Sequence, residues 1–254
     1  MANSKNMIFL QAANLTAFLI TVVVNALSNI LPLNGKTTGE MSDLYPNLFT
    51  PAGYVFSIWS IIYMLLLVFA VYQVLPRNRE KTFLRKISVF FVSSSILNIV
   101  WIFLWHYEQI VLSLVLMFAL LVTLIAIYLR LQIGQSNVPL TEKLCVHLPF
   151  SVYLGWITVA PIANVAAALI ATNWDGWGIS EVTWTILVII IALIITLTVI
   201  STRKDVAFSL VIIWALSGII VKQMENQSIV LTVSIGSIII GIALISRIIL
   251  ARSR

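Results

Sequence analysis

The sequence predicts an all-α polytopic membrane protein, and composition is the first reason. Of its 254 residues, 61% are hydrophobic and only 9% are charged, whereas a soluble domain is about 45–50% apolar and about 25% charged. A water-soluble fold cannot bury that much apolar surface, and a disordered chain needs low hydrophobicity and many charges. The single cysteine, Cys145, excludes a disulfide-stabilised secreted scaffold. A multi-pass membrane protein is the class that remains.

The second reason is a series of eight apolar runs. A helix needs about 20 apolar residues to cross the hydrocarbon core, and no run alternates polar and apolar residues over about ten positions as a barrel strand does. Only helices satisfy their backbone polar groups within one segment. We expect membrane-spanning helices at residues 7–31, 53–75, 87–105, 109–129, 144–170, 183–201, 206–221 and 228–250.

The basic residues predict the orientation of these helices. If the N-terminus lies in the cytoplasm, 13 of the 15 lysines and arginines are cytoplasmic, and only Lys36 and Lys222 lie outside. Cytoplasmic loops of membrane proteins carry such an excess of positive charge, and an odd number of spans would destroy the alternation. We expect eight spans in a cell membrane with both termini cytoplasmic. The net charge of +6 indicates no nucleic-acid partner, because the charges lie in short loops between apolar runs.

The first span carries a polar stripe that favours its retention in the mature protein. A cleavable signal peptide is the alternative, because Lys5 precedes the apolar run and Ala26 and Ser28 fit a cleavage site. The apolar stretch is long for a signal peptide, however, and its polar residues recur at helical spacing, so they share one helix face. A helix that faces a pocket or a neighbouring helix needs such a stripe, which consists of Gln11, Asn14, Thr21, Asn25 and Ser28.

Two outer connections differ in length and composition. The longer one, between Leu31 and Gly53, contains prolines and glycines that exclude a continuous helix. A loop longer than about 12–15 residues is often a lid over a functional site, with a slack connection as the alternative. The shorter connection, residues 172–182, contains Trp174 and Trp177. Because indole rings favour the membrane interface, we interpret these two tryptophans as part of an interfacial belt.

Several kinds of chemistry are absent from the sequence. Two histidines at opposite ends of their helices, His106 and His147, and one cysteine cannot form a metal cluster, and there is no glycine-rich phosphate loop. No carboxylate lies well inside a span, whereas proton- and ion-coupled carriers usually keep an ionisable group at that depth. We therefore expect no enzyme, no cofactor and no metal, and neither a pump nor a voltage sensor. A facilitator of a neutral solute stays open.

Tryptophan, tyrosine and amide side chains instead occupy the spans, and several share one depth. Counting inward from the expected outer helix ends at 1.5 Å per residue places Trp101 roughly 6 Å and Trp156 roughly 21 Å below the outer rim. Core packing explains any one of these side chains, but a shared layer beneath a long loop fits an apolar ligand pocket with a few polar groups. A depth of roughly 9–10 Å is common to Asn25, Trp59, Asn98 and Asn164.

Three segments around this layer resemble motifs of the TspO/MBR family, the tryptophan-rich sensory proteins related to the translocator protein or peripheral benzodiazepine receptor. The family's W-T-P-P-G…V-F-G-P-V-W-x-x-L-Y motif resembles FTPAGYVFSIWSIIY at Phe49–Tyr63. Its third-helix A-L-N-x-x-W motif resembles SILNIVWIFLW at Ser95–Trp105, and its fifth-helix P-Y-L-x-W…A…N motif resembles LPFSVYLGWITVAPIAN at Leu148–Asn164. The motifs follow the family's order on the second, third and fifth spans.

The resemblance covers residues 7–171 and implies a TspO-like five-helix transmembrane core at 1–171, followed by three additional transmembrane helices at 172–254. We expect a chain ending near Thr172 to insert, fold and bind. The resemblance also implies a pocket closed by the first long loop, a hydrophobic porphyrin-like ligand, contact with membrane lipid and commonly a homodimer. By motif matching, the residues that line or support the pocket are Trp59, Asn98, Trp101, Trp156, Ala160 and Asn164.

The chain also departs from the family's motifs. Phe49 stands where the family has tryptophan, and Ala52 replaces the second proline. The spacing from Gly53 to Trp59 is one residue shorter, which rotates Trp59 by about 100° on an α-helix. The family has a Trp-Tyr pair early in the first long loop, and no such pair is evident in this sequence. We therefore do not expect the family's porphyrin-degrading activity in this chain. The sequence favours a receptor-like or sensory ligand-binding protein, with a facilitator of a neutral or amphipathic solute and a membrane-partner assembly protein as alternatives.

Overall fold

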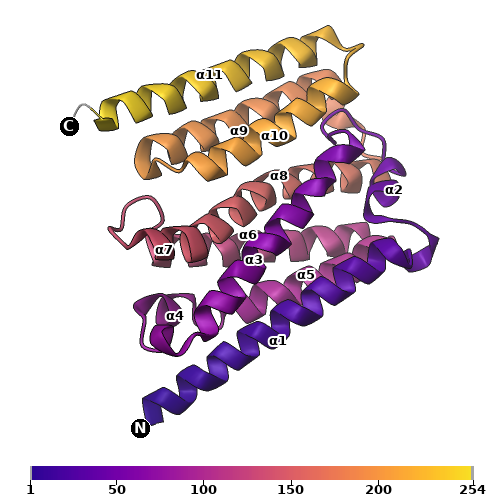
Figure 1. Cartoon of the computed structure of the whole chain (residues 1–254). Helices are drawn as coiled ribbons and strands as arrows, with labels where there is room; N and C mark the ends of the chain where they lie inside the picture. Colours follow the sequence, from indigo (N-terminus) through magenta and orange to yellow (C-terminus); the bar gives the residue numbers. More distant parts are fainter. Residues whose placement is uncertain (1, 253–254) are drawn as a thin grey trace.

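The computed structural model describes residues 2–252, and the regular structure of these residues is entirely helical (Figure 1). This confirms the all-α class that the sequence predicts. The long helices form an elongated bundle and match the eight expected apolar runs to within a few residues at most ends. They are α1 (Ala2–Ile30), α3 (Ile58–Val74), α5 (Phe90–His106), α6 (Ile110–Leu131), α8 (Leu148–Ala171), α9 (Glu181–Arg203), α10 (Val206–Lys222) and α11 (Gln227–Arg252).

The lengths of these helices suit a multi-pass membrane protein. Among residues 2–252, six helical segments are long and apolar enough to cross a membrane. Two more, α5 and α10, are apolar with 17 residues each, which gives about 25 Å of helix, at the lower limit for a span. The beginning of α1 and the end of α11 lie at the same end of the bundle as α4 (Thr82–Ile87) and α7 (Leu140–Glu142) (Figure 1). The eight-span count and the cytoplasmic termini stay predictions.

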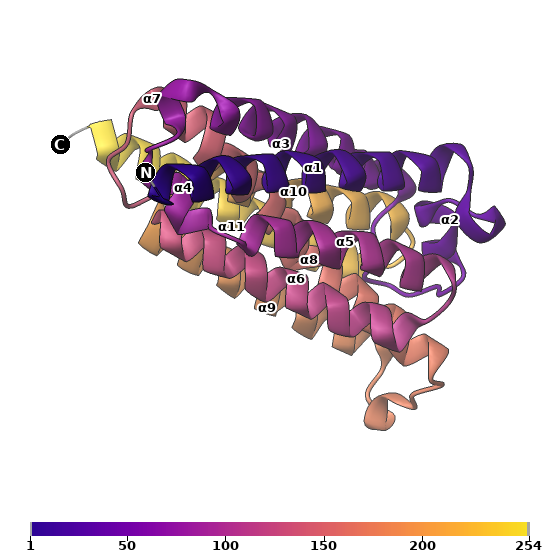
Figure 2. The ribbon, with the colours of Figure 1, turned by 90° about the horizontal axis from the view of Figure 1, so that it is seen from below.

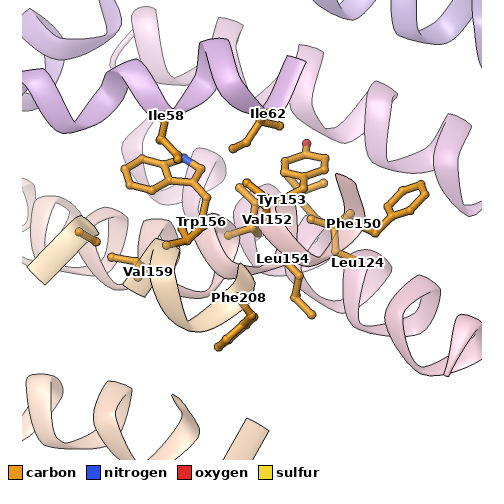
Figure 3. Close-up of a cluster of buried hydrophobic side chains, with 14 of the residues drawn as sticks. Ile58, Ile62, Leu124, Phe150, Val152, Tyr153, Leu154, Trp156, Val159 and Phe208 are labelled. Atoms are coloured by element: carbon orange, nitrogen blue, oxygen red, sulfur yellow. The ribbon is translucent and has the colours of Figure 1, made fainter. Parts of the chain in front are cut away.

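Helix α8 lies at the centre of the bundle and contacts α3, α6 and α10. Trp156 of α8 lies beside Ile58 of α3, and Leu154 lies on the face of α8 that is turned toward Phe208 of α10 (Figure 3). The close approach of α8 and α10 depends on Gly155, because a Cβ atom there would lie 3.1 Å from the Phe208 carbonyl oxygen. Helices α9 and α11 pack against each other and against α10 (Figure 1). The three C-terminal helices therefore join the rest of the protein chiefly through α10.

The polar stripe of α1 is buried against α3 and α5, as its spacing predicts. Near one end, the Asn14 amide donates to Gln73 Oε1 at 3.0 Å, and Gln73 Nε2 donates to the Gln11 carbonyl at 3.0 Å. Near the other, Asn25 Nδ2 donates to Asn98 Oδ1 at 2.7 Å. Because buried polar groups in a membrane protein must find partners within the protein, these bonds fix α1 as a bundle helix.

A buried carboxylate attaches α10 to α6 and α8. Asp205 caps α10 by accepting a hydrogen bond from the Phe208 amide at 3.1 Å. The Tyr128 hydroxyl of α6 donates to the same carboxylate at 2.9 Å, and the Ser151 hydroxyl of α8 donates to it as well. Asp205 lies just outside α10 but is only 7% exposed. One side chain thus joins three helices, which the position of Asp205 between two spans did not indicate.

Candidate functional site

The sequence-predicted site residues surround a small cavity, the aromatic chamber, at the end of the bundle covered by the α1–α3 connection. Five of the six residues line it: Trp59, Trp101, Trp156, Ala160 and Asn164. They come from α3, α5 and α8, which are the second, third and fifth long helices. Other lining residues include Phe56, Trp105 and Met117. The structure therefore brings together side chains from three distant segments.

Trp59 lies at the centre of this aromatic group. Its ring stacks on that of Trp101 with a centroid distance of 6.4 Å and meets that of Trp156 edge-on at 6.2 Å. It also stacks on Tyr63 at 5.5 Å and meets Tyr153 edge-on at 6.1 Å. Offset-stacked and edge-to-face pairs at these distances are favourable beyond the area that they bury.

The short Gly53–Trp59 spacing does not turn Trp59 away from the chamber, and the local backbone explains this. Residues Gly53–Ser57 form a 3-10 helix, η2, before α3 begins at Ile58. A 3-10 helix turns about 120° per residue and an α-helix about 100°. Five residues therefore gain about 100° of rotation, which equals the turn of one α-helical residue. The 3-10 segment offsets the missing residue.

The sixth predicted residue, Asn98, supports the chamber rather than lining it. It is fully buried and accepts the hydrogen bond from Asn25 of α1. Asn164 does line the chamber, where its Oδ1 accepts a hydrogen bond from Trp101 Nε1 at 3.0 Å. This bond fixes the plane of the Trp101 indole, so Asn164 both lines the chamber and orients one of its rings.

The predicted depth of Trp156 is wrong relative to that of Trp59. Counting from the helix ends places Trp156 roughly 12 Å deeper, yet the two rings are in contact, and Trp156 also meets Phe56 edge-on at 5.9 Å. The count assumes that the outer ends of α3 and α8 lie at one height. It also leaves out the reach of the two indole side chains, so it overstates the separation of the rings. Trp156 therefore belongs to the same aromatic layer.

The long connection between α1 and α3 covers the chamber. It contains a 3-10 turn, η1 (Leu33–Gly35), and a short helix, α2 (Thr38–Asp43). Thr38 and Ser42 of α2 line the chamber, and Trp105 Nε1 donates to the Thr38 carbonyl at 3.3 Å. Trp105 is buried and stacks on Trp101 at 6.0 Å, so it forms part of the chamber wall.

A capping box holds α2 in shape. The Glu40 amide donates to the Thr37 hydroxyl at 3.3 Å, and the Thr37 amide donates to the Glu40 carboxylate at 2.7 Å. Hydrogen bonds from the backbone and hydroxyl of Thr37 lower the pKa of Glu40. Hydrophobic periodicity does not identify α2, but the Thr-x-x-Glu pattern at 37–40 is the signal that finds such a helix start.

The chamber is nearly filled by its own side chains. Its volume is about 40 Å³, enough for about one or two water molecules. A larger cavity of about 540 Å³, the α1–α3 cavity, lies next to it and is lined by residues of α1, α2, α3 and α5. Thr38, Phe56, Trp59 and Trp101 line both spaces, so these four side chains form the wall between them.

Several polar atoms around the two cavities lack a hydrogen-bond partner within the described residues. Two that line a cavity are the Thr38 hydroxyl and Trp156 Nε1. Buried polar groups in native proteins are nearly always hydrogen-bonded. Donors at the wall of an otherwise apolar aromatic cavity are the groups that orient a mostly apolar ligand.

Comparison with known families agrees with this geometry. A family model described as TSPO-like protein matches residues 11–246. The chain belongs to the TSPO-like protein family. Searches of curated proteins and of solved structures give no match. The resemblance seen in the three sequence motifs is thereby confirmed, and the family match continues past residue 171 into α11.

In this TSPO-like protein, α10 reaches the edge of the chamber. The Ala52 amide donates to the Gly218 carbonyl at 3.1 Å, and Trp214 Nε1 donates to the Val55 carbonyl at 3.1 Å. Tyr54 meets Trp214 edge-on at 5.3 Å. These contacts hold the segment that carries Phe56 into the chamber. The division into a core at 1–171 and added helices at 172–254 stays a prediction.

Proposed function

We propose that this TSPO-like protein binds a flat, hydrophobic, porphyrin-like ligand and acts as a receptor or sensor rather than as an enzyme. The observation that carries the proposal is the convergence of Trp59, Trp101 and Trp156 from three helices under a structured lid. A flat aromatic ligand gains affinity by stacking on indole rings. Unpartnered donors such as Trp156 Nε1 are available to its polar edge.

Binding requires the chamber and the α1–α3 cavity to become one space. Ligand sites commonly occupy about 300–1,000 Å³, which the α1–α3 cavity reaches with about 540 Å³ and the chamber alone does not. Movement of the Trp59 ring opens the wall, and displacement of α2 opens the top. The ligand then replaces the contacts that the rings make with one another. A closed chamber and an opened one give a sensor two distinct states.

The test compares a metal-free porphyrin with haem in titrations of the full chain. Haem iron needs an axial ligand such as histidine, and no histidine lines the chamber or the α1–α3 cavity. We therefore expect the metal-free porphyrin to bind at least as tightly as haem, and His106→Ala to leave both affinities unchanged. If haem binds much more tightly and His106→Ala abolishes that binding, the site is one in which His106 ligates the haem iron, and the stacking site is wrong.

A facilitator of a neutral or amphipathic solute is the second candidate function, and the α1–α3 cavity favours it. That cavity contains both apolar side chains, such as Val22, and amides, such as Asn29. Flux in proteoliposomes separates the two functions. Saturable porphyrin binding without flux supports the receptor, and flux of the bound ligand supports the facilitator. Neither result, together with a co-purifying membrane protein, supports an assembly role.

A further inference from the structure

A second cavity lies outside the chamber, between α8 and α9. This outer groove has a volume of about 390 Å³. Its walls are largely apolar and include Ile162, Val165 and Leu169 of α8 and Val188 of α9. The outer groove shares no lining residue with the aromatic chamber. Its volume lies within the range of about 300–1,000 Å³ that small-molecule sites occupy.

Tryptophans close one end of the outer groove. Trp174 and Trp184 line it, with their ring centroids 5.4 Å apart. Trp184 Nε1 donates to the Gly176 carbonyl at 3.0 Å, which fixes the indole plane. Both rings belong to the α8–α9 connection and the first turn of α9, which project from the bundle at one end (Figure 2). The groove therefore offers fixed aromatic faces beside an apolar channel.

Two carboxylates lie at the same end, and neither is paired with a cation. Asp175 and Glu181 line the outer groove, which has no lysine, arginine or histidine among its lining residues. The ion pairs among the described residues involve other carboxylates. Glu181 Oε1 accepts the Leu48 amide at 3.0 Å, and Asp175 Oδ1 accepts the Trp177 amide at 3.0 Å. These bonds use one oxygen of each carboxylate, and within the described residues the second oxygen accepts no hydrogen bond.

We propose that the outer groove binds a lipophilic monovalent cation. The apolar body of the cation lies between α8 and α9, and its charged head lies between the two carboxylates and the faces of Trp174 and Trp184. Indole faces attract cations, most strongly when the cation is partly desolvated. The negatively charged carboxylates attract the cation as well. An anionic amphiphile is disfavoured, because its head would meet two negative charges.

The test uses methyltriphenylphosphonium as the cation and triphenylphosphine oxide as a neutral analogue of similar shape. Equilibrium dialysis of the full chain in maltoside micelles, with protein-free micelles as the blank, measures both. We expect saturable binding of the cation and weak binding of the neutral analogue. Glu181→Gln and Asp175→Asn each retain the hydrogen bond to the backbone, and each should weaken cation binding by about fivefold to tenfold. Glu225→Gln, another outer carboxylate that does not line the groove, should leave it unchanged.

Two further variants separate this site from the aromatic chamber. Ala166→Phe fills the outer groove and should abolish cation binding, whereas Trp156→Ala should leave it unchanged. Equal binding of the cation and the neutral analogue would overturn the proposal, as would full cation affinity in the Glu181→Gln/Asp175→Asn double variant. Stoichiometric displacement of the cation by added phosphatidylcholine would assign the groove to a choline lipid and would also overturn it.

Discussion

Asp205 shows how much one side chain can contribute to the assembly of a membrane bundle. Its carboxylate caps α10 and accepts hydrogen bonds from Tyr128 of α6 and Ser151 of α8. Its sequence context, a short basic turn between two apolar runs, indicates only a loop residue. Trp59 is a comparable case, because its position in the chamber depends on the 3-10 geometry of η2. Helical periodicity does not reveal either arrangement, since both arise from irregular backbone at helix ends.

Removal of the Asp205 carboxylate should destabilise the attachment of α10. Asp205→Ala deletes a helix cap and leaves two buried hydroxyls unpaired, so we expect a loss of about 2–3 kcal/mol in the free energy of unfolding. Tyr128→Phe removes one hydrogen bond and should lose about 1 kcal/mol or less. Reversible unfolding in mixed micelles measures both variants. Equal stability of Asp205→Ala and the unmodified chain would refute the role assigned to this carboxylate.

At the scale of elements, the long helices and a loop over the pocket were predicted, whereas hydropathy did not reveal the short helix within that loop. Each apolar run is long enough to be identified as a helix from its hydropathy. The spacing of the polar stripe indicated which face of α1 is buried, and Asn14 on that face bonds to Gln73. Helix α2 has only six residues, so no hydrophobic period identifies it. Its contact with Trp105 joins segments far apart in the chain. The chamber's aromatic residues and a covering loop were therefore predictable, whereas the helical form of the cover and its contact with Trp105 were not.

The lid should loosen in acid, because Glu40 supports it only as a carboxylate. The pKa of Glu40 is lowered in the folded protein from 4.5 by its hydrogen bonds with Thr37. The contribution of the capping box to the stability of α2 is therefore complete above pH 4.5 and is lost as the pH falls through the lowered pKa of Glu40. Amide hydrogen exchange of residues 38–43, corrected for intrinsic rates, should accelerate in that acid range. Glu40→Gln should remove this pH dependence, and an unchanged acid response in that variant would contradict the assignment.

At the scale of the whole molecule, the charge pattern of the sequence and the arrangement of the helices distinguish the same two ends of the bundle. The two lysines outside the predicted cytoplasmic face each meet a carboxylate at their own end of the bundle: Lys36 lies 3.8 Å from Glu108, and Lys222 lies 3.3 Å from Asp43. These exposed pairs contribute little stability, but they reduce the net positive charge at that end. The eight long apolar helices were predictable from hydropathy, whereas the packing of α10 on α8 was not, since no periodic signal encodes which helices become neighbours.

Cysteine labelling tests the eight-span topology. Asp43 is exposed at the lid end and Glu80 is exposed near α4 at the opposite end, so a single cysteine at each position in a Cys145→Ser background should react from opposite sides of the membrane. We expect position 43 to react from outside and position 80 only after permeabilisation. Reaction of both positions from the same side would exclude the topology.

Shortening the chain tests the division at residue 171. The sequence predicts that residues 1–171 fold and bind alone, but α10 holds Ala52 and Val55 beside the chamber. We therefore expect a chain ending at Thr172 to insert, to unfold at a lower temperature and to bind a porphyrin more weakly. Thermal unfolding and ligand titration measure these effects. Unchanged stability and affinity would show an autonomous core and would contradict the role of α10 at the site.

The most direct test of the central claim, that the aromatic chamber binds a flat hydrophobic ligand, is calorimetric titration of a metal-free porphyrin into three forms of the full chain. The unmodified protein should bind saturably, and Trp156→Ala should lose about 1–3 kcal/mol of binding free energy, the scale of a lost buried apolar contact. Trp177→Ala serves as the matched control, because Trp177 is 75% exposed and lines neither chamber nor cavity. The absence of saturable binding at micromolar concentration, or equal affinity in all three forms, would contradict the account.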